Sequence, residues 1–290
     1  PVPDIKENEA LVKVMAVGIC GSDIPRINKY GAYISPITPG HEFSGEIVEV
    51  GAAVKNFKVG DRVTVPPLLP CFKCEFCQQG HYSLCKDYKY FGSRNDGAFA
   101  QYVAVPEPNL LKVADNVSFE AAATADPLAN ALHAIKRGGF KPGDKVCVFG
   151  LGAIGLYCIQ YMKAKGAKIA VAVDVDERKL QVARDCGADV AIDGRAADVV
   201  DQVIAATEGG ADVCIDASGF PAAQHNAIEA TAKHGTMVLL GISHQPLTLS
   251  EKCLDWVMRG EKAIVGSWNS FSKPFPGWEW THGVESLADG

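Results

Sequence analysis

The sequence has 290 residues, enough for two domains of ordinary size with substantial hydrophobic cores. Its net charge is −6 and it contains no basic block, so the charge balance gives no support to nucleic acid or an anionic membrane as a partner. No apolar run is long enough to span a bilayer, and no signal peptide is recognisable.

The first part of the chain, residues 1–113, has the composition of a β-rich domain. Apolar and β-branched residues predict strands at 10–20, 43–51 and 59–65. Closely spaced proline and glycine residues separate these strands, which is typical of turns.

A helix-forming stretch follows at residues 118–139. Pro127 interrupts it, since proline removes a backbone donor and clashes with the preceding turn, and Gly138 closes it. The stretch marks the change from the β-rich part to a repeating pattern.

From residue 144 onward, strand and helix patterns alternate with short loops. The predicted strands are near-continuous apolar runs at 145–150, 168–174, 188–193, 211–218, 236–241 and 262–267. The predicted helices lie between them, at 153–165, 176–186, 197–207, from 221, and near 250–259. Six such units predict an α/β fold with a doubly wound, six-stranded parallel sheet of the Rossmann type, covered by helices on both faces.

Four cysteines stand close together in the segment "PCFKCEFCQQGHYSLCK": Cys71, Cys74, Cys77 and Cys85. Thiolates at this spacing can surround one tetrahedral ion, and a closed shell of four sulfurs suits a structural Zn²⁺ that catalyses nothing. A redox pair would need only two of them, and an iron–sulfur cluster is the remaining alternative. We therefore expect a metal that organises a loop, with the chemistry elsewhere.

The other six of the ten cysteines are scattered through predicted strands and helices: Cys20, Cys147, Cys158, Cys186, Cys214 and Cys253. Cysteine used in this way, as a small buried hydrophobe, is typical of reduced chains. The pattern predicts a cytoplasmic protein.

The motif "GLGAIG" follows a predicted strand and opens a predicted helix, the context in which such glycines bind a dinucleotide. Gly150 permits the tight turn, Gly152 lets the backbone approach a pyrophosphate, and Gly155 lets helix and strand pack closely. The amides of Ala153 and Ile154 would open the helix and face the phosphates. The alternative is a glycine-rich turn without a ligand.

Asp174 ends the second strand of this repeat. A carboxylate there would accept hydrogen bonds from the adenosine ribose hydroxyls and repel a 2′-phosphate, so NAD is favoured over NADP. Arg178 lies four residues further and is a candidate cofactor contact, although we favour a solvated helix face for it.

The motifs "GICGSD", "PGHEFSGEIVEVG", "GDRV", the cysteine loop and "GLGAIG" follow one another as they do in the zinc-containing medium-chain dehydrogenase/reductase superfamily. The whole chain resembles the polyol dehydrogenase branch of that superfamily. The resemblance implies a GroES-like, β-rich catalytic domain over residues 1–126, to which residues 271–290 return, and a NAD-binding Rossmann domain over residues 127–270. It also implies a homodimer or homotetramer. Both chain ends have the appearance of mid-fold sequence, and we expect further family segments beyond them.

The resemblance further implies a catalytic zinc, whose ligands would be Cys20, His41 and Asp126. Glu42 would lie behind these ligands or exchange with one of them, and Asp23 would orient His41.

Asp126 departs from the family, because related polyol enzymes have Glu at this position. Aspartate is one methylene shorter, so ligation would need a loop shift or a bridging water. The alternative is that Asp126 caps the helix that continues at Pro127.

The implied activity is the NAD-dependent oxidation of a secondary alcohol in a small-molecule polyol or polyol phosphate. Zinc would bind the hydroxyl and lower its pKa. Ser22, or a zinc-bound water held by Glu42, would accept the proton, and hydride would pass to the nicotinamide. Gly241 ends the strand segment "LLG" and would line the nicotinamide site.

Substrate residues are the least constrained by pattern. Arg94, in "FGSRNDG", is the candidate for a phosphate group, with Lys29 and Arg26 behind it. Trp268 and Asn269 are candidates for the polyol end. The alternatives are solvated surface charges for the cations and a core or interface filler for the tryptophan.

Three competing interpretations remain at this point. One is the same fold acting on sorbitol, a vicinal diol or threonine. A second is a zinc-free quinone reductase, which would lack both the four-cysteine loop and the pair formed by Cys20 and His41. The third is a non-catalytic NAD-binding protein on the same fold.

Overall fold

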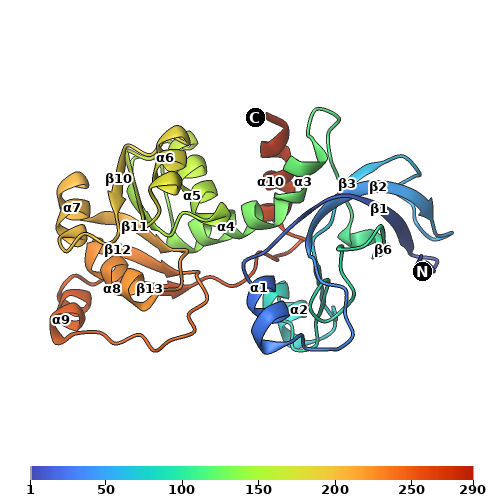
Figure 1. The fold of residues 1–290 in the computed structure, drawn as a ribbon, viewed down its shortest axis with the longest axis horizontal. Helices are drawn as coiled ribbons and strands as arrows, with labels where there is room; N and C mark the ends of the chain where they lie inside the picture. The colour runs from blue at the N-terminus through green and yellow to red at the C-terminus, as the bar shows by residue number, and fades with distance from the viewer. Residues whose placement is uncertain (1, 290) are drawn as a thin grey trace. The chain divides into compact units, whose positions relative to one another are not determined.

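The computed structural model describes residues 2–289, and the chain divides into two compact units. The first unit comprises Pro1–Ala129 and Ser270–Gly290, and the second comprises Asn130–Asn269. The expected boundaries lay after residues 126 and 270. In Figure 1, the red C-terminal helix accordingly belongs to the same unit as the blue N-terminal strands.

The first unit is built on a five-stranded antiparallel sheet with the order β6-β1-β2-β3-β7. Its strands are β1 (Glu9–Gly18), β2 (Glu42–Val50), β3 (Arg62–Thr64), β6 (Tyr102–Pro106) and β7 (Leu111–Lys112). Val12, Phe43 and Ile47 are buried in the core on one face of this sheet. The predicted β-rich first part is confirmed, with shifts of a few residues at the strand ends.

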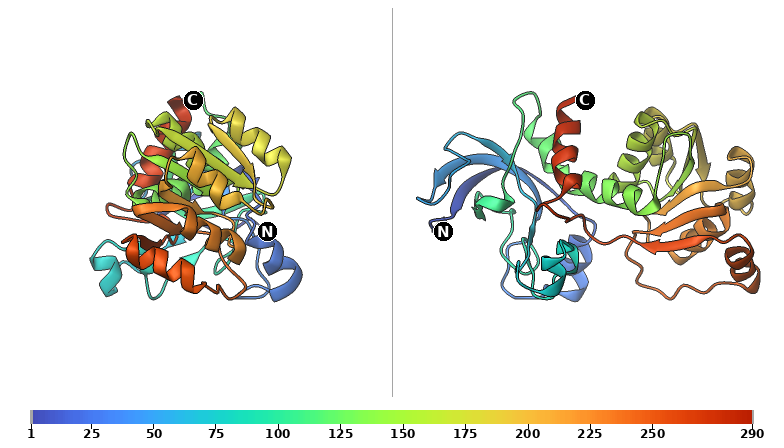
Figure 2. Two further views of the ribbon diagram at one scale, coloured as in Figure 1. Left: turned by 90° about the vertical axis from the view of Figure 1, so that its left-hand side faces the viewer. Right: turned by 180° about the vertical axis from the view of Figure 1, so that it is seen from behind.

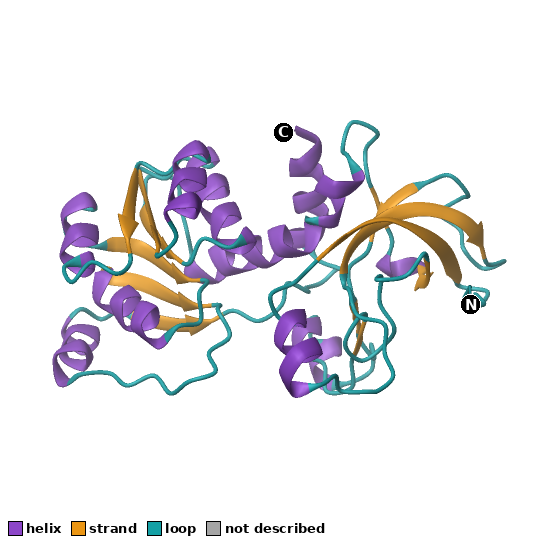
Figure 3. Cartoon of the chain, in the orientation of Figure 1, coloured by secondary structure: helices purple, strands orange, loops and turns teal. Residues whose placement is uncertain are grey.

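Short elements complete the first unit (Figure 3): α1 (Asp23–Pro25), η1 (Arg26–Tyr30), β4 (Leu68–Leu69), α2 (Glu75–Gln78), η2 (Tyr82–Leu84), β5 (Lys89–Tyr90), η3 (Glu107–Asn109), α3 (Phe119–Ala123) and α10 (Trp278–Asp289). β4 and β5 pair as a separate two-stranded ladder. α10 lies beside α3, as the right-hand view of Figure 2 shows, and the Asn116 side chain donates to the carbonyl of Ala288 at 2.8 Å.

The helical stretch predicted for 118–139 is two helices, α3 and α4 (Ala125–Gly138). The break falls at Thr124, whose carbonyl accepts the amide of Leu128 at 3.1 Å and so begins α4. Pro127 lies in the first turn of α4, where the backbone donor it lacks would have no partner in any case. The predicted interruption at Pro127 is therefore wrong, whereas the predicted end at Gly138 is confirmed.

The second unit contains a six-stranded parallel sheet with the order β10-β9-β8-β11-β12-β13. Its strands are β8 (Lys145–Phe149), β9 (Ile169–Asp174), β10 (Val190–Asp193), β11 (Ala211–Asp216), β12 (Thr231–Leu239) and β13 (Ala263–Gly266). This is the doubly wound Rossmann order, and all six predicted strands are present. β12 begins at Thr231, before the predicted residue 236, because Thr231 already pairs with Ala211 of β11. The regular pairing then resumes with Thr236 opposite Val213.

Helices cover both faces of this sheet (Figure 1). They are α5 (Ala153–Ala164), α6 (Glu177–Asp185), α7 (Val199–Ala206), α8 (Pro221–Ala230) and α9 (Glu251–Arg259). α4, α5 and α6 pack on one face, while α7, α8 and α9 pack on the other. Successive strand residues face the two cores in turn, with Val148 in one core and Cys147 in the other. This explains why the strands are apolar throughout.

None of the helices described between residues 2 and 289 combines the length and the hydropathy that crossing a membrane requires. The strand order of the second unit reverses between β8 and β11. In open α/β sheets, ligands bind at the carboxyl ends of the strands at such a reversal. The loops that follow these two strands are therefore the expected cofactor loops.

Candidate functional site

The four clustered cysteines meet around one point between α2, η2 and the preceding loop. The Sγ atoms of Cys71 and Cys77 lie 3.9 Å apart, as do those of Cys74 and Cys85. All four offer ligand atoms within 4.8 Å of one another. Sulfurs bound to Zn²⁺ at about 2.3 Å in a tetrahedron are about 3.8 Å apart, whereas a disulfide brings them to about 2.0 Å. The arrangement fits a tetrahedral metal and excludes a disulfide.

Backbone amides also converge on these sulfurs, as they do on metal-bound thiolates. The amide of Cys74 donates to Cys71 Sγ at 3.4 Å, and the amide of Cys71 donates to Cys85 Sγ at 3.3 Å. Such hydrogen bonds from backbone amides lower the pKa of Cys74 to about 6 and also lower that of Cys71. Burial raises the pKa of Cys77 and Cys85, so a cation is needed before all four are thiolates.

The aromatic C-terminal segment packs against this cysteine loop. Phe275 makes edge contacts with Phe72 and Tyr82 at ring-centroid distances of 5.4 Å, and Phe271 stacks on Trp280 at 5.5 Å. The Ser83 hydroxyl, within the loop, accepts the amide of Phe271 at 3.0 Å. Residues almost 190 positions apart thus share one core, which also contains Cys77 and Cys85.

A second group of polar side chains forms where β1 ends and β2 begins. The antiparallel register places Gly18 opposite Glu42, so the residues after β1 meet those before β2. Cys20, His41 and Glu42 consequently offer ligand atoms within 4.8 Å of one another. A Cβ at Gly18 would lie 2.5 Å from Glu42 Oε2 and would therefore displace the Glu42 carboxylate from its present position.

Hydrogen bonds and burial tune this group toward metal ligation. The amide and hydroxyl of Ser22 both donate to Cys20 Sγ, at 3.5 and 3.2 Å. His41 Nδ1 lies 3.6 Å from a carboxylate oxygen of Asp23, which leaves Nε2 for a metal. Burial lowers the pKa of His41, which keeps the imidazole neutral at neutral pH and able to act as a ligand.

The same pocket concentrates groups that resist ionisation in the absence of a cation. Burial, then Glu42, raises the pKa of Cys20 to about 12. Burial raises the pKa of Glu42. Tyr90 packs edge-on against His41 at 5.6 Å, and burial and then Asp126 raise its pKa well above the usual range. A divalent cation would reverse these shifts, so the donor set fits Zn²⁺.

Asp126 lies near this group but outside the set of three donors. It is the second residue of α4 and is 5% exposed, and its charge contributes to the raised pKa values of Cys20 and Tyr90. The alternative reading of Asp126 as a helix cap is wrong, because α4 has already begun at Ala125. The role of Asp126 as a zinc ligand stays a prediction, and Glu42 is the third donor that lies within 4.8 Å of those of Cys20 and His41.

The glycine motif adopts the turn predicted for a dinucleotide loop. Gly150 has a φ of 92°, and a Cβ there would clash with Ser218 of the neighbouring loop. A Cβ on Gly155 would overlap the carbonyl oxygen of Gly150, whereas Gly152 faces open space. α5 begins with Ala153 and Ile154, whose amides precede the helical hydrogen bonds and are left for a phosphate.

Two carboxylates, those of Asp174 and Asp216, hold the cofactor loops. Asp174 accepts the amides of Leu151 at 2.7 Å and Asp176 at 3.0 Å, so it braces the glycine turn from the end of β9. Arg178 is engaged by Asp176 through its Nε at 3.1 Å and its terminal nitrogen at 2.8 Å. That pairing agrees with a solvated helix face for Arg178.

Sequence reasoning missed the second carboxylate, Asp216. It is fully buried at the end of β11 and accepts the amide and hydroxyl of Ser218, at 2.9 and 2.6 Å. Its backbone carbonyl also accepts the amide of Gly241, and Gly219 is too close to Gly241 for either to carry a side chain. The signal was the turn sequence "DASG", which marks an Asx turn after a strand.

The aromatic partners of Arg94 were also missed. Its guanidinium lies over Tyr33 at 4.1 Å and over Tyr88 at 4.4 Å. Arg26 approaches the same Tyr33 ring at 5.6 Å and pairs with Asp23 at 3.4 Å. These contacts connect Arg94 to the surroundings of His41, and no local spacing predicts them.

Trp268 and Asn269 end the second unit. Trp268 is 49% exposed, which argues against a role as core filler within that unit. Asn269 has a φ of 52° in the left-handed region, a conformation for which Asn is favoured among non-glycine residues.

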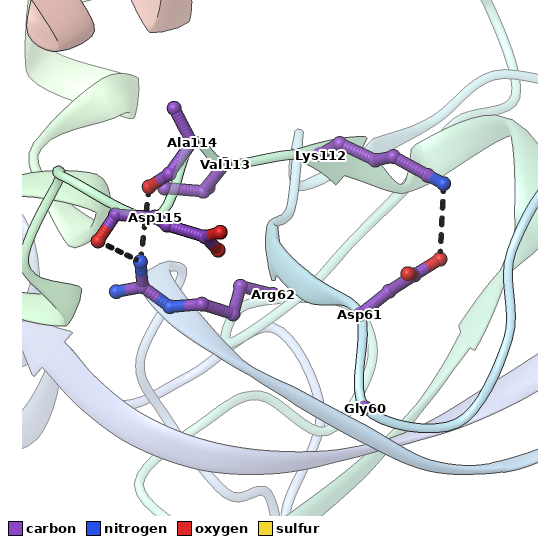
Figure 4. Close-up of a pocket in the computed structure, with 7 residues that line it drawn as sticks. All are labelled: Gly60, Asp61, Arg62, Lys112, Val113, Ala114 and Asp115. Carbon is purple, nitrogen blue, oxygen red and sulfur yellow. Dashed lines mark hydrogen bonds and ion pairs between the residues drawn. The ribbon is translucent and has the colours of Figure 1, made fainter.

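A separate surface groove lies beside β3 and β7 (Figure 4). The Arg62 guanidinium donates to the carbonyls of Ala114 and Asp115, each at 2.9 Å, and Lys112 pairs with Asp61 at 3.2 Å. These charges are satisfied within the fold. The groove therefore serves to fasten the strand ends, and the candidate site lies elsewhere.

Comparison with known proteins agrees with this geometry. Residues 6–115 match the family model of the alcohol dehydrogenase GroES-like domain, and residues 153–281 match that of the zinc-binding dehydrogenases. Galactitol 1-phosphate 5-dehydrogenase of Escherichia coli K12 is 37% identical over 282 residues, which cover 96% of this chain and 81% of that protein. Sorbitol dehydrogenase of Bacillus subtilis 168 is 37% identical over 299 residues, covering 100% of this chain and 82% of that protein.

Solved structures show the same relationship. The crystal structure of galactitol-1-phosphate dehydrogenase from Escherichia coli matches with a TM-score of 0.93 and 36% identity, covering 100% of this chain and 84% of that chain. A zinc-binding dehydrogenase of Sinorhizobium meliloti 1021 bound to NADP matches with a TM-score of 0.93 and 31% identity, covering 100% and 83%. The chain therefore belongs to the zinc-dependent medium-chain alcohol and polyol dehydrogenases, oxidoreductases that use zinc and a nicotinamide cofactor.

Proposed function

We propose that this enzyme oxidises a secondary alcohol of a sugar-alcohol phosphate with NAD, converting galactitol 1-phosphate to tagatose 6-phosphate. The observation that carries the redox chemistry is the convergence of Cys20, His41 and Glu42 in a buried, acid-rich pocket. The observation that favours a phosphorylated substrate is the position of the Arg94 guanidinium, which lies over the rings of Tyr33 and Tyr88.

Cys20, His41 and Glu42 would hold the catalytic zinc. Asp126, the position at which this chain departs from the family, would lie behind them. Zinc bound there supplies a Lewis acid that lowers the pKa of a substrate hydroxyl. The Ser22 hydroxyl donates to Cys20 Sγ, so its lone pairs remain to accept a proton from a nearby hydroxyl or water. Asp23 would orient His41, since its carboxylate lies 3.6 Å from the imidazole Nδ1, and Tyr90 packs edge-on against the same ring.

The four clustered cysteines would hold a second, structural zinc. Their sulfurs fill a tetrahedron and leave no position for substrate. The aromatic contacts from Phe271 and Phe275 suggest that this zinc also secures the C-terminal segment to the first unit.

The cofactor would be NAD, bound at Gly150, Gly152 and Gly155 with its pyrophosphate on the N-terminus of α5. Asp174 supports the NAD preference, since its carboxylate is positioned at the end of β9 and carries a negative charge that a 2′-phosphate would meet. Gly241 would lie along the nicotinamide half.

Arg94 is the proposed phosphate ligand. Among residues 2–289, its guanidinium forms no ion pair with a carboxylate, and its central carbon lies 4.1 Å from the ring centroid of Tyr33 and 4.4 Å from that of Tyr88. Contacts with ring faces do not use the N–H donors of an arginine, which therefore remain for an anion. Arg26 would add positive charge through the shared Tyr33 ring, while Lys29 is more exposed. Trp268 and Asn269 remain candidates for the polyol end.

A second candidate is an unphosphorylated polyol, because the Bacillus subtilis sorbitol dehydrogenase matches at the same identity. In that case Arg94 would only fasten the Tyr33 loop to Tyr88.

We further propose a cytoplasmic homodimer or homotetramer. β13 is an edge strand that pairs only with β12 in the part of the chain described, and Ile264 is 39% exposed on it.

The substrate assignment is tested by following NADH formation on galactitol 1-phosphate, galactitol and sorbitol. Arg94→Gln should lower kcat/KM for the phosphate about 10- to 100-fold, because a charged hydrogen bond is lost, and should leave free galactitol unaffected. Arg94→Lys should be intermediate, since lysine keeps the charge but not the planar fork. Equal rates on phosphorylated and free galactitol in the native enzyme would contradict the phosphate site.

His41→Ala should lower kcat at least about 100-fold while the affinity for NAD, measured by fluorescence titration, is retained. The reason is that His41 belongs to the first unit's donor set and not to the glycine loop. His81→Ala, an exposed histidine of the same unit, is the matched control and should remain active. Full turnover by His41→Ala would remove the metal mechanism.

Cys74→Ser should cost one zinc per chain, by atomic absorption, and lower the free energy of unfolding by about 4 kcal/mol, in the range seen for loss of a structural metal. The partly exposed Cys186, outside the cluster, supplies the control Cys186→Ser, for which zinc content should not change. An unaltered metal content in Cys74→Ser would rule out a four-cysteine zinc.

Asp174→Asn removes the charge and keeps one acceptor oxygen for the two amides of Leu151 and Asp176, so circular dichroism first verifies that the variant is folded. The ratio of NAD to NADP affinity should fall about tenfold, because a charge-assisted bond to the ribose is weakened and the repulsion of a 2′-phosphate is removed. Arg178→Gln should leave the ratio unchanged, since Asp176 already engages that guanidinium. If the ratio is the same in Asp174→Asn, the ribose contact is wrongly assigned.

A further inference from the structure

A third set of metal-binding side chains lies in the second unit, away from the cofactor loops and outside the first unit. His225 and Glu229 on α8 and Cys253 on α9 offer a nitrogen, an oxygen and a sulfur within 4.8 Å of one another. Nothing in the proposed reaction uses these residues.

The two helices present these donors for simple geometric reasons. His225 and Glu229 are four residues apart, so they share one face of α8. Ser250 caps α9 by accepting the amide of Cys253 at 3.1 Å, which fixes the thiol in the first turn of the helix. α8 and α9 pack against each other on the same face of the sheet.

Burial increases from the histidine to the thiol. The His225 side chain is 26% exposed and the Glu229 side chain 15%, whereas Cys253 is fully buried. His225 Nε2 lies 4.0 Å from Glu229 Oε1, and within residues 2–289 these two side chains form ion pairs only with each other. The donors are therefore reachable from solvent on one side and are not committed to other partners.

One cation faces the cluster. Lys262 donates to the carbonyls of Ile228 at 3.1 Å and Glu229 at 3.2 Å, so it is held by the end of α8 and not by the Glu229 carboxylate. Burial and then Glu229 raise the pKa of Cys253, so a cation bound beside this thiol would favour its thiolate form.

We propose that His225, Glu229 and Cys253 form a third zinc site. A histidine nitrogen, a carboxylate oxygen and a thiolate suit Zn²⁺ in tetrahedral geometry, with a water in the fourth position on the exposed side. Binding releases the thiol proton to solvent. The ion would join α9 to α8 and thereby fasten the C-terminal end of the long loop that precedes α9 (Figure 1).

The test counts zinc in the full chain after equilibrium dialysis against a buffer with micromolar free Zn²⁺. The native chain should retain one more zinc per chain than His225→Gln or Glu229→Gln. Added zinc should raise its melting temperature by several degrees more than that of either variant. NADH formation by both variants should stay within twofold of the native rate, which shows that the lost ion is not the catalytic one.

His234→Gln is the matched control, because His234 pairs with Glu261 at 3.4 Å on the surface of the same unit but has no thiol beside it. Its zinc content should equal that of the native chain. Cys253→Ser tests the buried donor, with circular dichroism to verify folding. The proposal is overturned if folded His225→Gln and Glu229→Gln retain the native zinc content, or if His234→Gln loses as much zinc as they do.

Discussion

The register in which β1 pairs with β2 determines where the chemistry of the first unit is located. Gly18 lies opposite Glu42, with Cys20 two residues after the end of β1 and His41 immediately before the start of β2. Backbone hydrogen bonds, which are indifferent to side-chain identity, thus bring a thiol, an imidazole and a carboxylate to one point. A slip of one residue would turn these side chains to the other face of the sheet. Gly18 is part of this constraint, because a Cβ there would displace the Glu42 carboxylate from its present position.

This convergence has an electrostatic cost that the fold does not offset by itself. The pKa values of Cys20, Glu42 and Tyr90 are all raised, with burial as the largest cause in each case. Asp23 and Asp126 add further negative charge to the same region. Groups perturbed together in this way are typical of functional sites, and a divalent cation is the ligand that relieves all of them at once.

The second unit anchors its cofactor loops through two carboxylates at strand ends. Asp174 binds the amide of Leu151 within the glycine motif, and Asp216 binds the amide and hydroxyl of Ser218 in the neighbouring loop. Because Gly150 has no side chain, the two loops can touch at Ser218. The two carboxylates thus come from β9 and β11, the strands on either side of β8, and the C-terminal aromatic segment gives the cysteine loop of the first unit a similar long-range support.

The sequence by itself determined the features that depend on neighbouring residues. Six apolar runs alternating with helical patterns specified the Rossmann sheet, since strands buried on both faces must be apolar throughout. The spacing of Cys71, Cys74, Cys77 and Cys85 was enough to predict one metal, because a single loop carries all four donors. The position of the helix break was mispredicted, because a proline in the first turn is tolerated and the choice of Thr124 depended on local hydrogen bonding.

Only the tertiary structure decided which distant side chains meet. It grouped Glu42, and not Asp126, with Cys20 and His41, because the β1–β2 register brings Glu42 to that point while Asp126 lies within α4. It also placed two tyrosine rings against Arg94, and it joined α8 and α9 into a cluster of three donors. No local spacing in the sequence predicts these contacts, because they arise from strand register and helix packing between segments far apart in the chain. Composition and periodicity report what each segment buries, whereas the identity of its partner is set by the packed fold.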